Sequence, residues 1–445
     1  MIRKFEFSDD SQRECLEQEL ISIGRRALFD TSTEDTVRNI IKTVVEKGDK
    51  ALVEYTKRFD GVSISSENIK VKESEFKNLE NIIEQDFKEA FAKAKENIRD
   101  YHSKQKVRND WILDAKNELF WYGESFTPIS SIGAYVPGGS APLISTLLMI
   151  CIPAKIAGVE KIRVATPPSS DGKLNPYILY ACKVLEVDEI YKIGGAQAIA
   201  ALAFGTESVR KVDKICGPGN KYVTEAKRQV FGYTGIDMLA GPSEVCILAD
   251  RSANPEFIAA DILSQAEHDP ESRAVLLTDS KKISNKVCEC LEEKLMSDKR
   301  RSILEKSLEK SFIILTDNID QAYELVQEIA PEHLEVMVSK LEKVKKRTFN
   351  AGAVFFGDYT PVVTGDVFAG PNHVLPTEQR ARFQSPLGVY DFIRRNSKLY
   401  YSKEKLFENK DIIMKLAEIE QLPWHKHSVE VRFKKELKAE GERDE

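Results

Sequence analysis

Six histidines occur in this chain of 445 residues, and four of them lie in segments that could do chemistry. An imidazole binds divalent metals and exchanges protons near neutral pH. Gln265 and His268 stand three residues apart at the end of a predicted helix that Asn254 caps and Pro270 stops, so their side chains project from neighbouring points of one face. An amide oxygen and an imidazole in this arrangement could hold a divalent cation. The ordinary alternative is a surface pair beside a turn.

A second candidate is the dipeptide Glu332-His333, which follows Pro331. We expect this proline to end the preceding helix and to expose the pair at an element boundary. A carboxylate beside an imidazole supplies two bases that titrate in different pH ranges, which suits successive proton transfers. An incidental pair without a catalytic role would look the same in the sequence.

Asp366 and His373 form a third candidate, because one loop carries both residues and Gly365 and Gly370 mark its bends. Loops of this kind often carry ligand-binding side chains on a rigid scaffold. The pattern therefore favours ligand placement as much as packing.

The remaining histidines are His102, His425 and His427. His425 comes just after a predicted helix that ends near Glu420. His427 lies two residues further on and cannot share a helical face with it, so we assign His427 to solvent. His102, at the end of a long charged helix, receives the same assignment.

The seven cysteines show no zinc-finger spacing and lie mostly in apolar surroundings, as in Met149-Ile150-Cys151-Ile152. We interpret them as reduced thiols that take no part in the chemistry. Any metal would then use nitrogen and oxygen ligands.

Composition excludes several classes of partner. Hydrophobic residues make up 42% of the chain, charged residues 31%, and the net charge is −6, so there is no basic surplus for nucleic acid or an anionic membrane. The most apolar stretch, residues 141–158, is interrupted by Pro153 and Lys155 and is expected to be buried rather than to span a bilayer. The first residues lack the apolar core of a signal peptide, so we expect a cytoplasmic protein.

From about residue 130, short apolar strands alternate with glycine-rich turns and helix starts. Strands at 132–136, 189–193 and 212–216 lead into turns containing Gly138, Gly194 and Gly217, respectively, and a strand is also predicted at 161–165. This alternation predicts a parallel, doubly wound sheet whose ligands bind beyond the carboxyl ends of the strands. The turns could admit the phosphates of a nucleotide, although none forms the G-x-G-x-x-G motif, and ordinary turns are as good an explanation.

The same pattern resumes further along, which predicts a second α/β unit. Other segments are predicted as helices: a short one at 11–23, a long charged one at about 74–103, and the chain from about 396 onward. The strands of the second α/β unit are predicted at 244–249, 274–278 and 312–316.

Seven segments in one order, over roughly residues 10–435, resemble the histidinol dehydrogenase family. Each segment alone is weak, but their joint occurrence is specific. They are residues 132–142, 194–200, 217–220, 240–245, 264–268, 331–335 and 370–377.

The resemblance implies the last step of histidine biosynthesis, in which L-histidinol is oxidised to L-histidine through L-histidinaldehyde by two NAD⁺. It also implies one Zn²⁺ per subunit and a homodimer with intertwined terminal segments, in which Glu420 and His425 complete the site of the other subunit. The fold that it implies consists of two doubly wound, incomplete Rossmann-like α/β sheet domains plus small helical N- and C-terminal segments exchanged across the homodimer.

The resemblance assigns roles to individual residues. The metal ligands would be Gln265, His268, Asp366 and His425, and the proton-transfer pair would be Glu332 and His333. The substrate would contact the metal ligands and His333, and in addition Ser243, His373 and Glu420. The NAD contacts would be Tyr135, Gln197 and Asn220.

The expected domains are discontinuous. They are an N-terminal helical segment at 1–25, a first α/β domain at 26–135 and 242–388 with most metal and catalytic residues, a second α/β domain on the NAD side at 136–241, a C-terminal helical segment at 389–435 that reaches the partner subunit, and a charged tail at 436–445.

The sequence departs from the family pattern at three places. Val362 stands where a glutamate is expected, Val367 where an aromatic residue is usual, and residues 378–380 (Glu-Gln-Arg) where small residues are common. These departures leave every proposed ligand in place, but they predict different packing around Asp366.

Three rival functions have to be weighed against this one. A paralogous NAD-dependent dehydrogenase of another alcohol, such as a sulfonated diol, would need a cationic side chain after Pro137-Gly138-Gly139, where Ser140 and Ala141 stand. A carboxylate at Glu420 also suits a cationic substrate. A metal-dependent hydrolase would use Glu332 to activate water without any cofactor. A non-catalytic, zinc-stabilised dimer would show no dehydrogenase activity.

Overall fold

The computed structural model describes residues 2–23, 31–105, 110–113, 118–138, 142–296 and 300–434. The chain forms two compact units. The first comprises Met1–Lys106 and Ile129–Phe392, and the second comprises Val107–Pro128 and Ile393–Glu445. Within the described residues, no helix combines the length and the apolar character needed to cross a membrane.

The first unit contains a six-stranded sheet in which all strands run parallel. Its strand order places β9 and β12 side by side, with Val245 opposite His333. The strands, in spatial order, are β1 (Arg3–Glu6), β11 (Phe312–Leu315), β10 (Arg273–Thr278), β9 (Glu244–Ala249), β12 (His333–Met337) and β13 (Ala353–Phe356).

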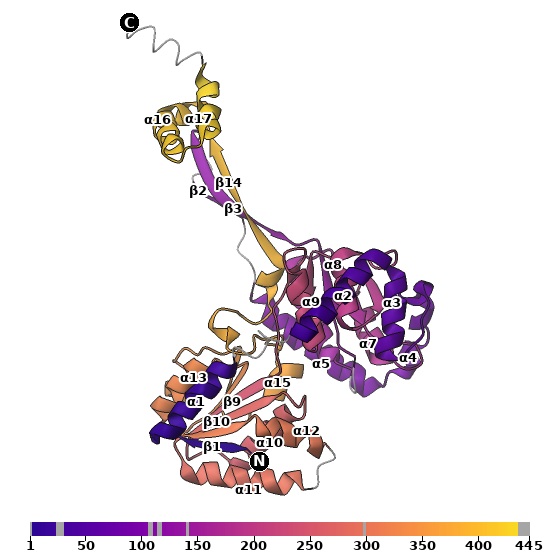
Figure 1. Cartoon of the computed structure of the whole chain (residues 1–445), viewed down its shortest axis with the longest axis vertical. Coiled ribbons are helices and arrows are strands. Elements are labelled where there is room, and N and C mark those ends of the chain that lie inside the picture. Colours follow the sequence, from indigo (N-terminus) through magenta and orange to yellow (C-terminus); the bar gives the residue numbers. More distant parts are fainter. Residues whose placement is uncertain are drawn as a thin grey trace. The chain divides into compact units, whose positions relative to one another are not determined.

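Helices cover both faces of this sheet (Figure 1). Successive side chains of a strand point to opposite faces, so Val245 and Ile247 of β9 enter one hydrophobic cluster and Cys246 and Leu248 another. The first cluster includes residues of α10 (Pro255–Ala266), α11 (Lys281–Leu295) and α12 (Arg301–Glu309), and the second includes residues of α1 (Asp10–Ile23) and α13 (Ile319–Ile329). Short helices α14 (Leu341–Val344) and α15 (Val362–Val367) flank β13 in the sequence.

A second parallel sheet of five strands lies in the same unit. β4 is central and pairs with β5 and β7, as expected for a doubly wound arrangement. The strands, in spatial order, are β6 (Glu189–Lys192), β5 (Lys161–Thr166), β4 (Ser131–Tyr135), β7 (Lys214–Cys216) and β8 (Gly235–Ile236).

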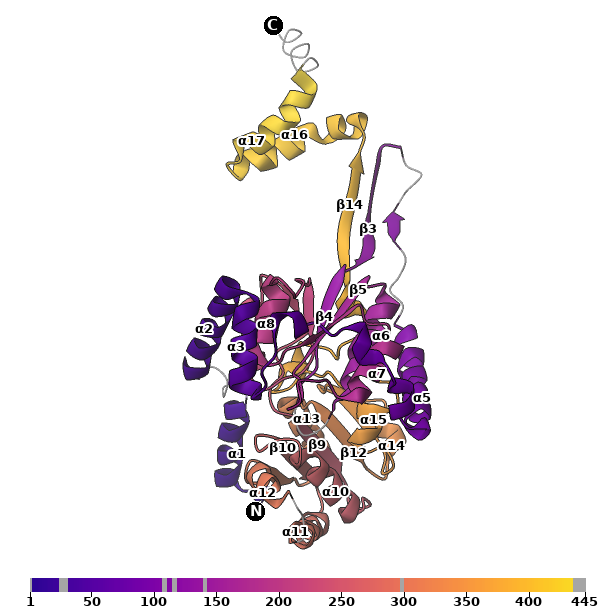
Figure 2. The same ribbon diagram turned by 90° about the vertical axis from the view of Figure 1, so that its right-hand side faces the viewer.

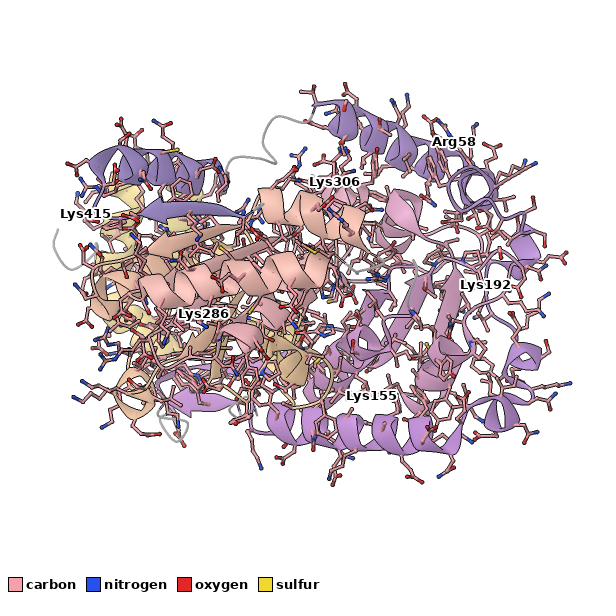
Figure 3. The ribbon with its side chains drawn as sticks, turned by 90° about the horizontal axis from the view of Figure 1, so that it is seen from below. Arg58, Lys155, Lys192, Lys286, Lys306 and Lys415 are labelled. Atoms are coloured by element: carbon pink, nitrogen blue, oxygen red, sulfur yellow. The ribbon has the colours of Figure 1, made fainter. Side chains whose placement is uncertain are left out.

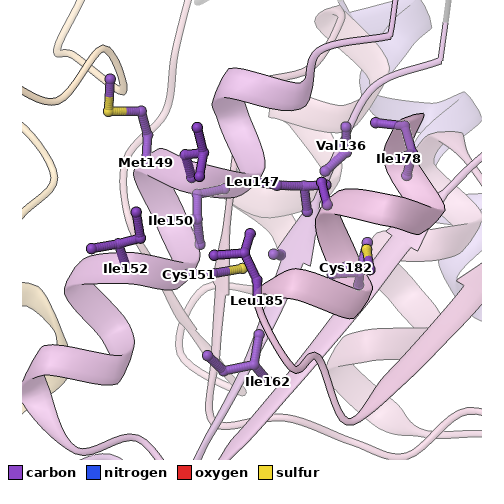
Figure 4. Close-up of a cluster of buried hydrophobic side chains, with 14 of the residues drawn as sticks. Val136, Leu147, Met149, Ile150, Cys151, Ile152, Ile162, Ile178, Cys182 and Leu185 are labelled. Atoms are coloured by element: carbon purple, nitrogen blue, oxygen red, sulfur yellow. The ribbon is translucent and has the colours of Figure 1, made fainter. Parts of the chain in front are cut away.

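Both faces of the second sheet are also covered. Ile132 and Ala134 pack with residues of α5 (Gln85–Ser103), α6 (Ile144–Ala157) and α7 (Pro176–Val184), whereas Tyr135 packs on the opposite face with residues of α2 (Thr31–Lys47), α3 (Asp49–Tyr55), α8 (Gly195–Phe204) and α9 (Lys221–Val230). Figure 4 shows the first of these cores, where Leu147 and Cys151 of α6 lie near Cys182 of α7. All seven cysteines lie in the described residues, and none forms a disulfide.

The outer faces of the covering helices carry charged side chains. Lys286 of α11, Lys306 of α12 and Lys155 of α6 are exposed (Figure 3). Helices α11 and α12 therefore have one apolar face toward the sheet and one polar face toward solvent, which is the pattern of a surface helix. Helix α6 differs, because residues 146–154 are all buried and only Lys155, near its C-terminal end, is exposed.

The second unit consists of an antiparallel sheet and two helices (Figure 2). Strand β14 (Ile393–Tyr401) pairs along its whole length with β3 (Phe120–Pro128), and β2 (Trp111–Leu113) pairs with the other edge of β3. Helices α16 (Lys403–Ile419) and α17 (Pro423–Glu430) pack against each other after β14.

The structure confirms the predicted strands that form the two parallel sheets, and it corrects three predictions. Residues 396–401 are not helical, because they belong to β14 and pair with β3. The charged helix predicted at 74–103 starts only at Gln85, since the short helix α4 (Leu79–Ile82) and a 3₁₀ turn at Glu73–Phe76 precede it. Strand β1 was not predicted within the helical N-terminal segment, although it forms an edge of the six-stranded sheet.

Candidate functional site

Helix α10 places two of the predicted metal ligands at its C-terminal end. The side chain of Asn254 accepts a hydrogen bond from the backbone N–H of Glu256, which caps the helix at its start. The helix ends at Ala266, so Gln265 is buried in its last turn while His268 follows it and is exposed. The predicted helix end is therefore confirmed, and the two side chains differ in their access to solvent.

Glu332 and His333 stand at the amino end of β12, where they are only 6% and 4% exposed. The expectation that Pro331 exposes this pair is wrong, because the neighbouring start of β9 covers it. Glu332 Oε2 accepts a hydrogen bond of 2.9 Å from the backbone N–H of Glu244, and it lies 3.5 Å from His333 Nδ1.

The second nitrogen of His333 points away from this backbone contact. The ring Nδ1 lies 3.0 Å from the carbonyl oxygen of Glu244. A carbonyl oxygen can only accept, so Nδ1 carries the hydrogen and Nε2 holds the lone pair in the neutral ring. Nε2 is buried, has no hydrogen-bond partner among the described residues and lies 3.5 Å from Asp366 Oδ1. This nitrogen is therefore available to a ligand.

Asp366 lies in α15 and connects His333 to His373. The backbone carbonyl of Asp366 is 2.6 Å from His373 Nδ1, and the other ring nitrogen of His373 lies 3.4 Å from the hydroxyl of Thr146 in α6. The structure thus brings together Glu332, His333, Asp366 and His373, which come from two separate stretches of the sequence, residues 332–333 and 366–373.

Charges within this cluster shift its protonation equilibria. Burial works to raise the pKa of Asp366, but His333, whose Nε2 lies 3.5 Å from Asp366 Oδ1, brings it below its usual value, with smaller contributions from His373 and His268. Burial works to lower the pKa of His333, yet Glu332 and Asp366 raise it well above the usual value. Burial lowers the pKa of His373. Asp366 is therefore an anion, and His268 lies close enough to it to contribute.

The start of β9 forms the wall beside this cluster. The carbonyl of Ser243, a predicted substrate contact, accepts a hydrogen bond of 3.1 Å from the backbone N–H of Arg273. The next residue, Glu244, is buried, and burial raises its pKa to about 7, with Arg273 opposing and Glu332 reinforcing that shift. Ser243 therefore lies one residue from the backbone groups that hold Glu332 and His333.

The predicted nucleotide contacts Tyr135 and Gln197 lie at the carboxyl end of β4 and in the first turn of α8. The hydroxyl of Tyr135 accepts a hydrogen bond of 3.1 Å from the backbone N–H of Gly195. Gln197 is 1% exposed, and neither its amide nitrogen nor its amide oxygen has a hydrogen-bond partner in the part of the chain that the structure describes. A buried amide without partners is costly, so this side chain is suited to a bound ligand.

Asn220, the third predicted nucleotide contact, caps α9. Its side-chain oxygen accepts hydrogen bonds from the backbone N–H groups of Tyr222 and Val223. The preceding turn begins at Gly217, whose φ of +124° suits glycine and where a Cβ atom would lie 2.1 Å from the carbonyl oxygen of Tyr135. This turn therefore packs directly against the end of β4.

A buried ion pair holds the same turn in place. Lys227 and Asp237 form a salt bridge, and their side chains are 2% and 0% exposed. Lys227 Nζ donates to the carbonyl of Gly217, and Asp237 Oδ2 accepts from the N–H of Gly217 at 2.7 Å. Both backbone groups of the turn are thus bound to charged side chains.

Replacing Lys227 by Met should lower the free energy of unfolding by about 3–5 kcal/mol, because the carboxylate of Asp237 would stay buried without its cation. Urea unfolding monitored by circular dichroism measures this loss. The matched control is Lys155→Met, which breaks the exposed pair with Glu186 and should leave the unfolding curve nearly unchanged. If both substitutions lowered the free energy of unfolding equally, burial of the Lys227–Asp237 pair would not be the cause of the loss.

Glu420 and His425 lie in the second unit. Glu420 follows the last residue of α16, His425 is in α17, and both are exposed. Within the described residues of one chain, no group of three or more His, Cys, Asp or Glu side chains has an arrangement that could hold a metal ion. Such a group would not include the amide oxygen of Gln265 or a ligand from a second chain.

The three departures from the family pattern lie in α15 and after His373. Val362 is buried in the cluster between α10 and the six-stranded sheet, where an apolar side chain packs well. Val367 is 46% exposed. Glu378 and Gln379 have φ angles of 52° and 66°, and Glu378 pairs with Arg380 at 2.8 Å.

Sequence reasoning missed two acids next to the site, the half-buried Asp261 and the buried Glu335. Glu335 follows His333 by two residues in an apolar strand, and Asp261 precedes Gln265 by four residues in an apolar helix. A charged residue inside an otherwise apolar strand or helix face is the signal that could have identified them.

The fold and the site together define the class of the protein. It is a doubly wound α/β enzyme with a buried carboxylate–imidazole pair at the amino end of one sheet and glycine turns at the carboxyl ends of the strands of another. Turns of the second kind, before helix starts, are typical of nucleotide-binding proteins.

Comparisons with known proteins agree on one family. The family model described as histidinol dehydrogenase matches residues 24–433. Histidinol dehydrogenase from Clostridium acetobutylicum is 48% identical over 400 residues, which cover 90% of this chain and 92% of that protein. The protein of the same name from Caldanaerobacter subterraneus subsp. tengcongensis is 50% identical over 399 residues, with coverage of 89% and 92%.

A solved structure supports the same conclusion. The crystal structure of histidinol dehydrogenase from Elizabethkingia anophelis is similar with a TM-score of 0.88 and 37% identity, covering 97% of this chain and 98% of that one. The chain belongs to the histidinol dehydrogenase family, and it is an oxidoreductase of histidine biosynthesis. The family assignment made from the sequence motifs is confirmed.

Proposed function

We propose that the chain oxidises L-histidinol to L-histidine through L-histidinaldehyde, with two NAD⁺ and one water consumed per turnover. The observation that carries this proposal is the buried group of Glu332, His333 and Asp366, in which one imidazole nitrogen is left without a partner. The reaction releases two hydrides to two NAD⁺, and the protons of the hydroxyl and of the added water pass to bases on the protein.

The residues present fit a zinc ion. Gln265, His268 and Asp366 would supply an amide oxygen, an imidazole and a carboxylate, and Asp366 remains anionic because its pKa is lowered. His425 of a second subunit would complete the set. When bound, zinc would hold the donor groups of the amino alcohol and orient its carbinol carbon.

The residues also fit a dinucleotide. Tyr135, Gln197 and Asn220 stand at the carboxyl ends of strands of the five-stranded sheet or at the helix starts that follow them. The amide of Gln197 lacks a hydrogen-bond partner within the described residues. Parallel α/β sheets bind their ligands at this end. We place NAD⁺ there and the substrate next to His333.

In the first oxidation, His333 Nε2 accepts the hydroxyl proton as a hydride leaves the carbinol carbon for NAD⁺. The hydrogen bond of Nδ1 to the Glu244 carbonyl fixes the ring so that Nε2 holds the lone pair. In the metal-free chain, the carboxylates of Glu332 and Asp366 raise the pKa of His333. A cation held by Asp366 would offset the charge of that carboxylate and so favour the neutral ring.

In the second oxidation, Glu332 takes a proton from the water that adds to the aldehyde carbon. Once His333 has passed its first proton to solvent, the resulting hydrate gives its remaining hydride to a second NAD⁺ and a proton to His333, which leaves the carboxylate of histidine. Glu332 is oriented for this step by the N–H of Glu244. Ser243 and His373 would contact the substrate from β9 and from the Asp366 loop.

We further propose a homodimer in which the terminal segments of each chain reach the other, so that Glu420 and His425 contribute to the partner's site. The second unit supports this, because it exposes large apolar side chains that a partner could cover. They include Leu113, Leu399, Ile412, Leu416, Ile419 and Trp424, which are between 52% and 78% exposed.

A chelator experiment tests the proposed function. We expect purified protein with L-histidinol and NAD⁺ to produce two NADH per histidine formed, as followed by NADH absorbance and amino-acid chromatography. Prior dialysis against EDTA should abolish NADH formation, and added Zn²⁺ should restore it. NADH formation at an unchanged rate after verified metal removal would contradict the zinc proposal.

The same assay separates the rival functions. A hydrolase would release product without NADH, and a non-catalytic dimer would change its sedimentation with EDTA but never reduce NAD⁺. A dehydrogenase of a sulfonated diol would reduce NAD⁺ with that diol and not with histidinol. Relatives named histidinol dehydrogenase at 48% and 50% identity favour histidinol among these substrates.

A further inference from the structure

Two carboxyl groups, one buried and one half-buried, lie next to the site without belonging to the proposed reaction. Glu335 of β12 is 1% exposed, and its side chain points to the same face of the sheet as that of His333, since the two are separated by one residue of the strand. Asp261 of α10 is half-buried and stands one helical turn before Gln265.

The two acids face each other. Their side chains share a hydrogen bond. Two carboxylates cannot donate to each other, so this contact requires one proton between them. Burial, first of all, raises the pKa of both groups, and their mutual interaction adds to the shift for Glu335. The pair therefore keeps a proton where isolated acids would lose it.

Glu335 also holds the start of α15. Its Oε1 accepts a hydrogen bond of 2.9 Å from the backbone N–H of Val362, the first residue of that helix. Its Oε2 is buried, and no N–H or O–H group within the described residues donates to it, so a proton shared with Asp261 is the hydrogen bond open to this oxygen. A single side chain of β12 thus binds both α15 and α10.

Packing reinforces the position of α15. At Gly365 a Cβ atom would lie 2.6 Å from the ring of Phe355, so this turn of the helix lies directly on β13. Phe355 in turn lies beside the His333 ring, with 6.0 Å between the ring centroids. Asp366, the next residue after Gly365, is therefore fixed by a hydrogen bond at one end of the helix and by close packing beside it.

We propose that Glu335 and Asp261 form one hydrogen-bonded carboxyl pair that fixes α10, β12 and α15 relative to one another. These elements carry Gln265, His333 and Asp366, so the pair sets the distances among the metal ligands and the proton-transfer group. Both acids are positioning residues, and neither contacts the reacting atoms. This inference depends on the proposed zinc site.

The test compares three variants of the full-length protein by their affinity for Zn²⁺, measured by competition with a chromogenic chelator. Glu335→Leu removes both hydrogen bonds, and Asp261→Leu removes only the one between the acids. Glu335→Gln keeps both, because its amide oxygen accepts from Val362 N–H and its amide nitrogen donates to Asp261. Glu256→Gln, an exposed change in α10, is the control.

We expect Glu335→Leu to weaken Zn²⁺ binding about 10–100-fold, as loss of an outer partner of metal ligands does. Asp261→Leu, at a half-buried position that tolerates change better, should weaken binding in the same direction. Glu335→Gln and Glu256→Gln should bind Zn²⁺ like the unchanged protein, and the KM for NAD⁺ should stay constant in all four.

Two results would overturn the inference. One is unchanged Zn²⁺ affinity in Asp261→Leu, and the other is a Glu335→Gln variant that binds as weakly as Glu335→Leu. Failure of the unchanged protein to bind Zn²⁺ or to oxidise histidinol would instead contradict the proposed function. Melting temperatures of the metal-free variants show whether a variant has lost stability in general. A loss of Zn²⁺ affinity that comes from positioning should be absent in Glu335→Gln, which keeps both hydrogen bonds.

Discussion

Replacing His333 by Asn should lower the rate of both oxidations by about 10²–10⁴-fold, which is the range for loss of a general acid–base group. The asparagine amide nitrogen can take the place of Nδ1 and keep the hydrogen bond to the Glu244 carbonyl. Nothing in asparagine replaces Nε2, the buried nitrogen without a partner. The substitution therefore removes the base and preserves the backbone contact.

The measurement is NADH formation with L-histidinol and, separately, with L-histidinaldehyde as substrate. Both rates should fall together, because the same nitrogen accepts a proton in each half of the reaction. His427→Asn makes the same chemical change in α17, at a ring whose nearest partner is Glu430 at 3.4 Å, and should leave both rates unchanged. A variant of His333 that keeps its full rate in either half would exclude this nitrogen as the base for that half.

The strand pattern predicted the two parallel α/β units, but it missed the strands β1, β8, β12 and β13 of their sheets. Apolar strands followed by glycine turns report on local structure, so β4, β6 and β9 lie where the sequence placed them. Strand β14 could not be predicted in this way, because its stability comes from pairing with β3, as in the contact of Asn396 with Ser125. Such pairing depends on residues that are distant in the sequence.

Four residues predicted from the sequence, Glu332, His333, Asp366 and His373, lie together in the structure, but their surroundings were not predicted. Gln265 and His268 follow from a helix end that local signals mark, and Glu332 and His333 stand out as a pair. Their burial was not predictable, because the start of β9 covers them and supplies the backbone groups of Glu244. These contacts join residues nearly ninety positions apart, as the separation of 88 residues between Glu244 and Glu332 shows.

Replacing Glu332 by Gln should slow the oxidation of the aldehyde about 10²–10⁴-fold and spare the oxidation of the alcohol. The glutamine oxygen can still accept the hydrogen bond that Glu332 Oε2 receives from the N–H of Glu244 at 2.9 Å. Geometry at the start of β12 should therefore survive. Glutamine cannot take a proton from water, so hydration of the aldehyde loses its base while His333 still accepts the hydroxyl proton.

Single-turnover kinetics can separate the two halves. With L-histidinol, this variant should form the first NADH at nearly the normal rate and the second one slowly, so that aldehyde accumulates and can be trapped with a carbonyl reagent. Glu324→Gln, an exposed change on α13, should behave like the unchanged protein. Because Glu332 also lies 3.5 Å from His333 Nδ1, its charge helps to raise the pKa of that ring. If this electrostatic effect is the main role of Glu332, both halves will slow equally, and the division of labour between the two residues will be refuted.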